Sequence, residues 1–158
     1  MKLARVIHLD NSDANVFSNS ATEGEWAITG TFAFIDTDLN TLSRKDVLGF
    51  KEGWLGLSTF GYATLVEVST MKDSEFDSAC RRLATHIYEK YNAPGMLVAL
   101  EAATNEIKDM GVICQHSEGT LLSIKREISE KEIKEQVRVI HPPPEKLHAK
   151  IWTIEDEQ

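Results

Sequence analysis

Two stretches of helical periodicity, joined by a very short break, limit the possible folds of this chain more than any other feature. Apolar residues recur every three or four positions in both, as on the buried face of a surface helix. The first stretch covers residues 74–91 and carries Phe76, Cys80, Leu83, Ile87 and Tyr91. The second covers residues 95–112 and carries Met96, Leu100, Ala103, Ile107 and Met110. Asn92-Ala93-Pro94-Gly95 breaks the pattern, so we expect an antiparallel helical hairpin.

The rest of the chain has the patterns of short strands. Residues 25–35 alternate, and the bulkier side holds Trp26, Ile28, Gly30, Phe32 and Phe34. This pattern predicts one half-buried strand. Further strands are expected over 3–9, 63–69, 119–128 and 133–140, and a short helix runs from the cap Ser43 to near Gly53. The order β-β-α-β-α-α-β-β predicts an α+β fold with a mainly antiparallel sheet of about five strands and the hairpin packed on one face.

The sequence His141-Pro142-Pro143-Pro144 marks the end of the predicted sheet, because proline cannot donate a hydrogen bond to a neighbouring strand. A chain of 158 residues is long enough for one domain, which we assign to residues 1–141. Residues 142–158 form a C-terminal tail. Its large apolar residues lead us to expect that part of the tail docks on the domain or on a partner. They are Leu147, Ile151, Trp152 and Ile154.

The charge balance is acidic, with 17 Lys and Arg against 25 Asp and Glu and a formal net charge of −8. Such a chain repels phosphates on average. The positive charges of residues 125–138 are matched by negative ones, as on a solvated pair of strands. We therefore expect no nucleic-acid partner. No stretch reaches the roughly 20 apolar residues of a membrane span, so we expect no membrane partner and a cytoplasmic location, where Cys80 and Cys114 stay reduced.

The pair Cys114-x-His116 is the strongest candidate in the sequence for catalysis or metal binding. Three interpretations are open: a buried thiol beside a histidine at a helix end, a catalytic thiol with a nearby base, and two ligands of a metal ion. A tetrahedral metal site needs four ligands. The remaining candidates are Cys80, His8, His86, His141 and His148, which are scattered along the chain. We favour the buried thiol and predict no metal and no cofactor.

A glycine-rich segment, Gly53 to Gly61, places Trp54, Leu57 and Phe60 among glycines. It lacks the Gly-Lys-Ser/Thr of a phosphate-binding loop, and a predicted helix precedes it where a dinucleotide-binding fold would have a strand. The segment connects that helix to a strand, and connections run over the surface. We therefore predict that Trp54, Leu57 and Phe60 form a binding surface for a partner protein. The alternative is that the two aromatic side chains cover the core.

Several short motifs carry a family resemblance. They are Gly24-Glu25-Trp26-Ala27, Phe32-Ala33-Phe34, Gly53-Trp54-Leu55-Gly56, Ser58-Thr59-Phe60-Gly61, Thr64-Leu65-Val66 and Cys114-Gln115-His116-Ser117-Glu118-Gly119-Thr120-Leu121. They resemble a family of small bacterial proteins that is a domain of unknown function. The resemblance covers about residues 1–141. The tail from Pro142 onward resembles an extension beyond the point where members of that family end. Members of that family sit among genes for iron–sulfur and molybdenum redox enzymes and cofactor attachment, so the resemblance implies an accessory role and no catalytic residues.

Two hypotheses of function follow. The first is a non-enzymatic accessory or protein-interaction domain that supports a bacterial redox enzyme, of the iron–sulfur or molybdenum type, or its maturation. The second is a small enzyme or cofactor-binding protein that uses Cys114 and His116. We favour the first because the sequence contains neither Gly-x-Ser-x-Gly nor His-Glu-x-x-His. Self-association of the chain is compatible with both.

Overall fold

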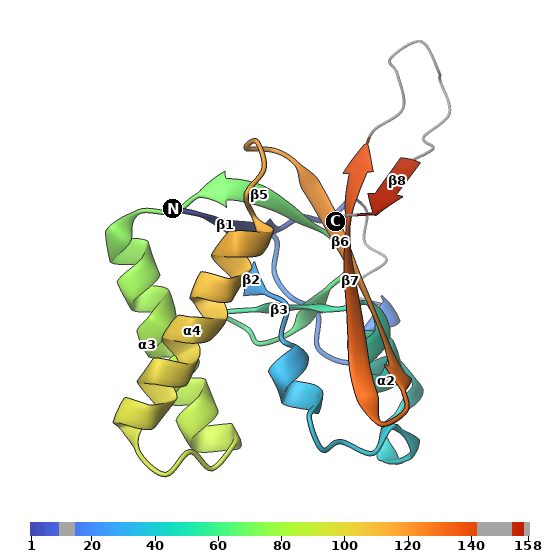
Figure 1. Ribbon diagram of the computed structural model, residues 1–158, viewed down its shortest axis with the longest axis vertical. Helices are drawn as coiled ribbons and strands as arrows, with labels where there is room; N and C mark the ends of the chain where they lie inside the picture. The colour runs from blue at the N-terminus through green and yellow to red at the C-terminus, as the bar shows by residue number, and fades with distance from the viewer. Residues whose placement is uncertain (10–14, 142–152, 157–158) are drawn as a thin grey trace.

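The computed structural model describes residues 1–9 and 15–141 and the backbone of residues 153–156. Figure 1 shows an α+β architecture in which a long, curled sheet carries a pair of helices lying side by side. The strands are β1 (Lys2–Val6), β2 (Trp26–Ile28), β3 (Trp54–Gly56), β4 (Tyr62–Ala63), β5 (Val66–Thr70), β6 (Leu121–Ser129), β7 (Glu132–His141) and β8 (Thr153–Asp156). The helices are α2 (Arg44–Glu52), α3 (Asp73–Lys90) and α4 (Met96–Ile113).

Within the described residues, the sheet has eight strands in the order β4-β3-β2-β1-β5-β6-β7-β8, and each neighbouring pair is antiparallel. The α+β class and the antiparallel sheet are as predicted, but the expected number of about five strands is too low. The five predicted strands correspond to β1, β2, β5, β6 and β7. The additional ones are β3, in the glycine-rich segment, β4, directly after that segment, and β8, in the tail. Residues 142–152, which include Leu147, Ile151 and Trp152, lie outside the described residues.

The strand predicted over residues 25–35 is only three residues long. Chain direction changes at Gly30, which has a φ of 77°, and the residues after it form a 3₁₀ helix, η1 (Thr31–Phe34). A Cβ at position 30 would lie 2.5 Å from the Cβ of Leu55 on β3, so this close approach requires glycine. The alternating pattern was a poor guide here because Phe32 and Phe34 belong to the 3₁₀ helix and not to the strand.

The helical hairpin is confirmed. Helices α3 and α4 pack along their length and are joined by residues 91–95, where Asn92 takes a φ of 53°. The contact uses small side chains beside large ones, which lets the helices approach closely. The buried residues are Ala79, Cys80, Leu83, Ala84 and Ile87 on α3, and Ala99, Ala103, Ile107 and Met110 on α4. They join the side chains of the central strands in one apolar core.

Ile87 provides a test of this core. Its side chain is 8% exposed and belongs to the cluster between the hairpin and the sheet. Replacing Ile87 with Ala should lower the free energy of unfolding by about 2–5 kcal/mol, because the substitution leaves a cavity. Chemical denaturation measures the loss. The adjacent Tyr88 is exposed, so Tyr88→Ala should change stability by no more than about 0.5 kcal/mol. Equal effects of the two substitutions would contradict the packing described.

A buried arginine joins the far end of the sheet to helix α2. Arg126 on β6 donates hydrogen bonds from its guanidinium to the carbonyl oxygens of Phe50 at 2.7 Å and Gly53 at 2.9 Å, at the C-terminal end of α2. It also donates to the carbonyl oxygen of Thr29 and lies 3.6 Å from a Glu135 carboxylate oxygen. Burial lowers the pKa of Arg126 to about 10.

The sequence led us to expect solvated charges in residues 125–138, and for Arg126 this expectation is wrong. Its side chain is completely inaccessible to solvent. The charge is tolerated there because the carbonyl groups at the end of a helix carry partial negative charge and otherwise lack donors. Arg126 therefore stabilises the junction between two elements that are far apart in the sequence.

Candidate functional site

The glycine-rich segment does not present the surface predicted for it. Trp54 is 0% exposed and Leu57 is 2% exposed. The reason is that the segment is part of the sheet, with β3 paired to β2 on one side and to β4 on the other. The prediction that Trp54 and Leu57 form a binding surface is therefore wrong. Trp54 instead packs in the core, as the alternative interpretation of the segment expected.

A buried carboxylate holds the turn that follows β3. Glu25 accepts hydrogen bonds from the backbone N–H groups of Ser58 at 2.9 Å and Thr59 at 3.0 Å, and from the Thr59 hydroxyl at 2.9 Å. Gly56 leaves room for this carboxylate, since a Cβ at that position would collide with it. The side chain of Glu25 is fully used by these contacts and by the N–H of Thr22. Its role is therefore structural.

Phe60, the third predicted surface residue, is half-buried on an aromatic cluster. Its backbone has a φ of 55°, and its ring is stacked on the imidazole of His86 with 3.8 Å between centroids and 2° between planes. Tyr91 lies against His86, with centroids 5.8 Å apart, and against Phe32, with centroids 5.4 Å apart. The cluster connects the turn after β3 to the end of α3.

The stacking of His86 has a consequence for stability at acid pH. Burial lowers the pKa of His86 below its ordinary value of 6.5, the positive charge of Lys90 lowers it further, and Glu89 opposes both. The unfolded chain therefore takes up a proton at a higher pH than the folded chain does. It follows that the contribution of His86 to stability is complete above about pH 6.5 and is lost as the pH falls through the folded-state pKa.

We expect His86→Phe to reduce this sensitivity to acid, because phenylalanine keeps the stacked ring and cannot bind a proton. Melting temperatures of the wild type and the variant, measured from neutral pH to about pH 5, test the expectation. The wild type should lose more on acidification than His86→Phe does. His141 on β7 is exposed, and His141→Gln serves as the control that keeps the acid loss of the wild type. Identical pH profiles for wild type and His86→Phe would show that protonation of His86 does not contribute to the loss of stability at acid pH.

The pair Cys114 and His116 lies where α4 ends. Cys114 is the C-cap residue, with its N–H bonded to the carbonyl of Met110, and the N–H of His116 donates to the carbonyl of Cys114 at 2.8 Å. Both residues line an open hollow of about 720 Å³ together with Lys2 and Lys108. Cys114 is nonetheless completely buried. Because a nucleophilic thiol has to reach its substrate, this geometry favours the structural interpretation of Cys114.

The metal interpretation of the pair gains no support from the surroundings. Within the residues that the structure describes, no group of three or more His, Cys, Asp or Glu side chains is placed to hold a metal ion. The other cysteine, Cys80, is buried between α3 and α4.

In the described part of the chain, no helix is long and apolar enough to cross a membrane.

An exposed apolar surface lies at the end of the helical hairpin, which we call the hairpin tip. It consists of Tyr88, Tyr91, Met96, Leu97 and Val98. All five residues are within one turn of the connection between α3 and α4, at the lower end of the hairpin in Figure 1. Leu97 is 83% exposed, more than any other large apolar residue described. Large apolar side chains gathered in this way are typical of interaction sites.

The sequence contained a signal for the hairpin tip that was not used. Met96, Leu97 and Val98 are three consecutive apolar residues at the start of a helix, and a single apolar stripe can bury only part of such a run. The buried face of α4 begins with Ala99. The residues before it therefore had to be exposed in an isolated chain.

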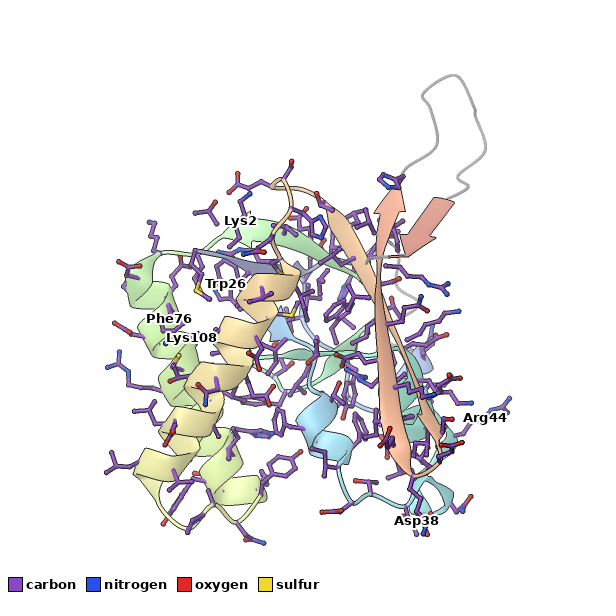
Figure 2. All side chains as sticks on the ribbon, in the orientation of Figure 1. Lys2, Trp26, Asp38, Arg44, Phe76 and Lys108 are labelled. Atoms are coloured by element: carbon purple, nitrogen blue, oxygen red, sulfur yellow. The ribbon has the colours of Figure 1, made fainter. Side chains whose placement is uncertain are left out.

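A cleft of about 300 Å³ lies at the opposite end of α3. It runs between the first turns of that helix and the ends of β2 and β3. Its lining residues are Trp26, Leu57, Ser58, Ser74, Glu75, Ser78, Ala79 and Arg82. Figure 2 shows Trp26 beside the N-terminal half of α3. These residues come from three distant parts of the chain, so no sequence motif indicates the cleft.

Comparison with known proteins identifies a family. A family model described as a family of unknown function (DUF6505) matches residues 1–155. This match extends beyond residue 141, where the resemblance of the sequence was expected to end, and includes most of the tail. No curated protein and no solved structure matches the chain. Since the model spans nearly the whole chain, the protein belongs to the DUF6505 family.

Proposed function

We propose that this protein is a non-enzymatic accessory domain that binds a partner protein through the hairpin tip. The observation that carries the proposal is the exposure of five large apolar side chains at one end of the hairpin, led by Leu97. Exposure of these apolar side chains to water is unfavourable, and burial against a partner protein removes that cost. Tyr88 and Tyr91 add ring area and hydroxyl groups, which suit the centre of an interface.

Charge defines the partner surface that fits. Helices α3 and α4 together carry seven acidic and four basic side chains, and the whole chain has a net charge of −8. Glu89 and Glu101 lie within one helical turn of the tip residues, against the one cation Lys90, so the surroundings of the tip are acidic by one charge. Opposite charges across an interface steer association and fix orientation. The complementary surface is therefore an apolar recess with a basic rim on the partner protein.

The sequence resemblance indicates which partners to test first. It implies redox enzymes with iron–sulfur or molybdenum centres, or the proteins that mature them. An accessory domain of this kind needs no active site of its own. The complete burial of Cys114 supports this proposal over an enzyme that uses Cys114 and His116.

The experiment compares two serine substitutions on the same helix. Leu97→Ser removes the most exposed tip residue, and Val112→Ser removes an apolar residue that is 65% exposed at the other end of α4. Both should fold with stability within about 0.5 kcal/mol of the wild type. Proteins captured from the native host by the wild type and by Val112→Ser, but not by Leu97→Ser, are then purified. We expect Leu97→Ser to weaken their binding about tenfold or more.

Two results would overturn the proposal. One is a captured partner that binds Leu97→Ser as tightly as it binds the wild type, because the tip would then not be the interface. The other is a purified wild-type chain that forms a dimer which Leu97→Ser converts to a monomer. Sedimentation equilibrium detects that dimer, and it would assign the tip to self-association.

A further inference from the structure

The geometry points to a second binding site on this protein, in the cleft between Trp26 and the first turns of α3, that takes a small planar organic anion. The cleft is distinct from the hairpin tip. Ser74 and Tyr88 are separated by about 20 Å along α3, since a helix rises 1.5 Å per residue. Figure 1 shows the corresponding ends of α3 at opposite ends of the hairpin. The inference therefore goes beyond the proposed function and does not depend on it.

One wall of the cleft is held rigid by an aromatic and ionic stack. The guanidinium of Arg5 lies over the indole of Trp26, 3.9 Å from its centroid, and donates to the carbonyl oxygen of Gly24 at 2.9 Å. The same guanidinium is 3.4 Å from a carboxylate oxygen of Glu75. The other oxygen of Glu75 accepts from the N–H of Lys72 at 3.1 Å. Arg5 thus fixes the indole and neutralises the carboxylate in the cleft.

On the same side of the cleft, the buried carboxylate of Glu25 holds the segment after β3, where the N–H of Leu57 donates to the carbonyl oxygen of Trp26 at 2.7 Å. It binds the N–H groups of Ser58 and Thr59, as described above, and so fixes the position of Ser58 at the edge of the cleft. Leu57, next to it, supplies an apolar floor. The side of the cleft formed by Trp26, Leu57 and Ser58 is therefore held in place before any ligand arrives, which reduces the cost of ordering a binding site.

The remaining polar groups of the cleft belong to exposed residues. Within the described residues, the hydroxyls of Ser58, Ser74 and Ser78 and the guanidinium of Arg82 take part in no hydrogen bond or ion pair. Arg82 contributes the only charge of the lining that is not neutralised by Arg5 or Glu75. Three free hydroxyls and a free guanidinium form a set of donors suited to a carboxylate or another small anionic group.

The apolar lining of the cleft indicates the chemistry of the uncharged part of the ligand. Trp26 offers an indole beside the donor groups, and the buried side chains of Leu57 and Ala79 lie beneath it in the lining. A flat ring attached to an anionic group matches this combination, because the ring contacts the apolar side chains while the anion meets Arg82. The volume of about 300 Å³ suits a molecule with a single ring. A cation is disfavoured by the positive charge of Arg82, which is not neutralised within the lining.

Benzoate is the simplest probe with this chemistry, and binding is followed by NMR on the full chain. In a titration, the indole N–H signal of Trp26, assigned with Trp26→Phe, should shift and saturate. Arg82→Gln should weaken binding at least tenfold. Arg81→Gln is the matched control, since Arg81 and Arg82 are adjacent and both exposed, and only Arg82 lines the cleft. It should bind benzoate like the wild type.

Benzyl alcohol and inorganic phosphate separate the two parts of the inference. Benzyl alcohol has the ring without the charge, and phosphate has the charge without the ring, so each should bind more weakly than benzoate. The inference is overturned if benzoate produces no saturating shift. It is also overturned if phosphate binds as tightly as benzoate, or if Arg81→Gln and Arg82→Gln have the same effect. None of these results changes the expectation for Leu97→Ser, so the two sites are tested separately.

Discussion

Arg126→Met should lower the free energy of unfolding by about 3–5 kcal/mol, because it removes a buried charge and leaves its partners behind. The carbonyl groups of Phe50, Gly53 and Thr29 would lose their donor, and Glu135 would lose its cation. An unsatisfied buried polar group costs about 1–3 kcal/mol, and methionine has a similar length but no donor. Denaturant unfolding monitored by circular dichroism measures the change.

The neighbouring Lys125 provides the control for Arg126. It lies on the same strand and is exposed, so Lys125→Met should change stability by no more than about 0.5 kcal/mol. Arg126→Lys keeps the charge but loses the planar fork that reaches several carbonyls at once, and its effect should fall between the two. A variant Arg126→Met as stable as the wild type would mean that the junction between α2 and β6 does not depend on this side chain.

Trp54→Ala is the second substitution with a large expected effect, a loss of about 3–5 kcal/mol. Trp54 is completely buried on β3 and belongs to the central core, so alanine leaves a cavity that the neighbouring strands cannot fill. Thermal and denaturant unfolding test this expectation. The result also distinguishes the packing role from the surface role predicted from the sequence, since replacing an exposed tryptophan with alanine would lower the free energy of unfolding by about 0.5 kcal/mol or less.

A phenylalanine at position 54 separates volume from hydrogen bonding. The indole N–H of Trp54 is buried without an acceptor among the described residues, so Trp54→Phe gives up no hydrogen bond and keeps most of the ring. We expect it to be clearly more stable than Trp54→Ala. If both variants were destabilised equally, the cavity explanation would be contradicted.

The sequence predicted well the elements whose signals are local and repeated. Helices α3 and α4 have several turns of apolar periodicity and a Pro-Gly break between them, and both occur within a residue or so of the expected bounds. The β6–β7 hairpin also has long strands with a short turn. In these segments, the pattern and the tertiary environment favour the same structure.

The sequence predicted poorly the elements that depend on distant contacts. Strand β3 has three residues and lies between glycines, so its pattern resembles a connection, and only pairing with β2 and β4 makes it part of the sheet. Arg126 stands directly between the charged residues Lys125 and Glu127, a pattern typical of a solvated strand, and only its contact with the end of α2 shows that it is buried. The cleft at Trp26 is assembled from strand ends and a helix that no local pattern brings together.

The most direct test of the proposed function is hydrogen exchange of the protein with and without the purified partner. We expect slower exchange of backbone amides in residues 88–101, which include the hairpin tip and the first turn of α4, while residues 107–113 at the other end of α4 exchange as in the free chain. Leu97→Ser should abolish this protection at the same protein concentrations. Protection confined to any other surface, with residues 88–101 exchanging as in the free chain, would contradict the assignment of the hairpin tip as the interface.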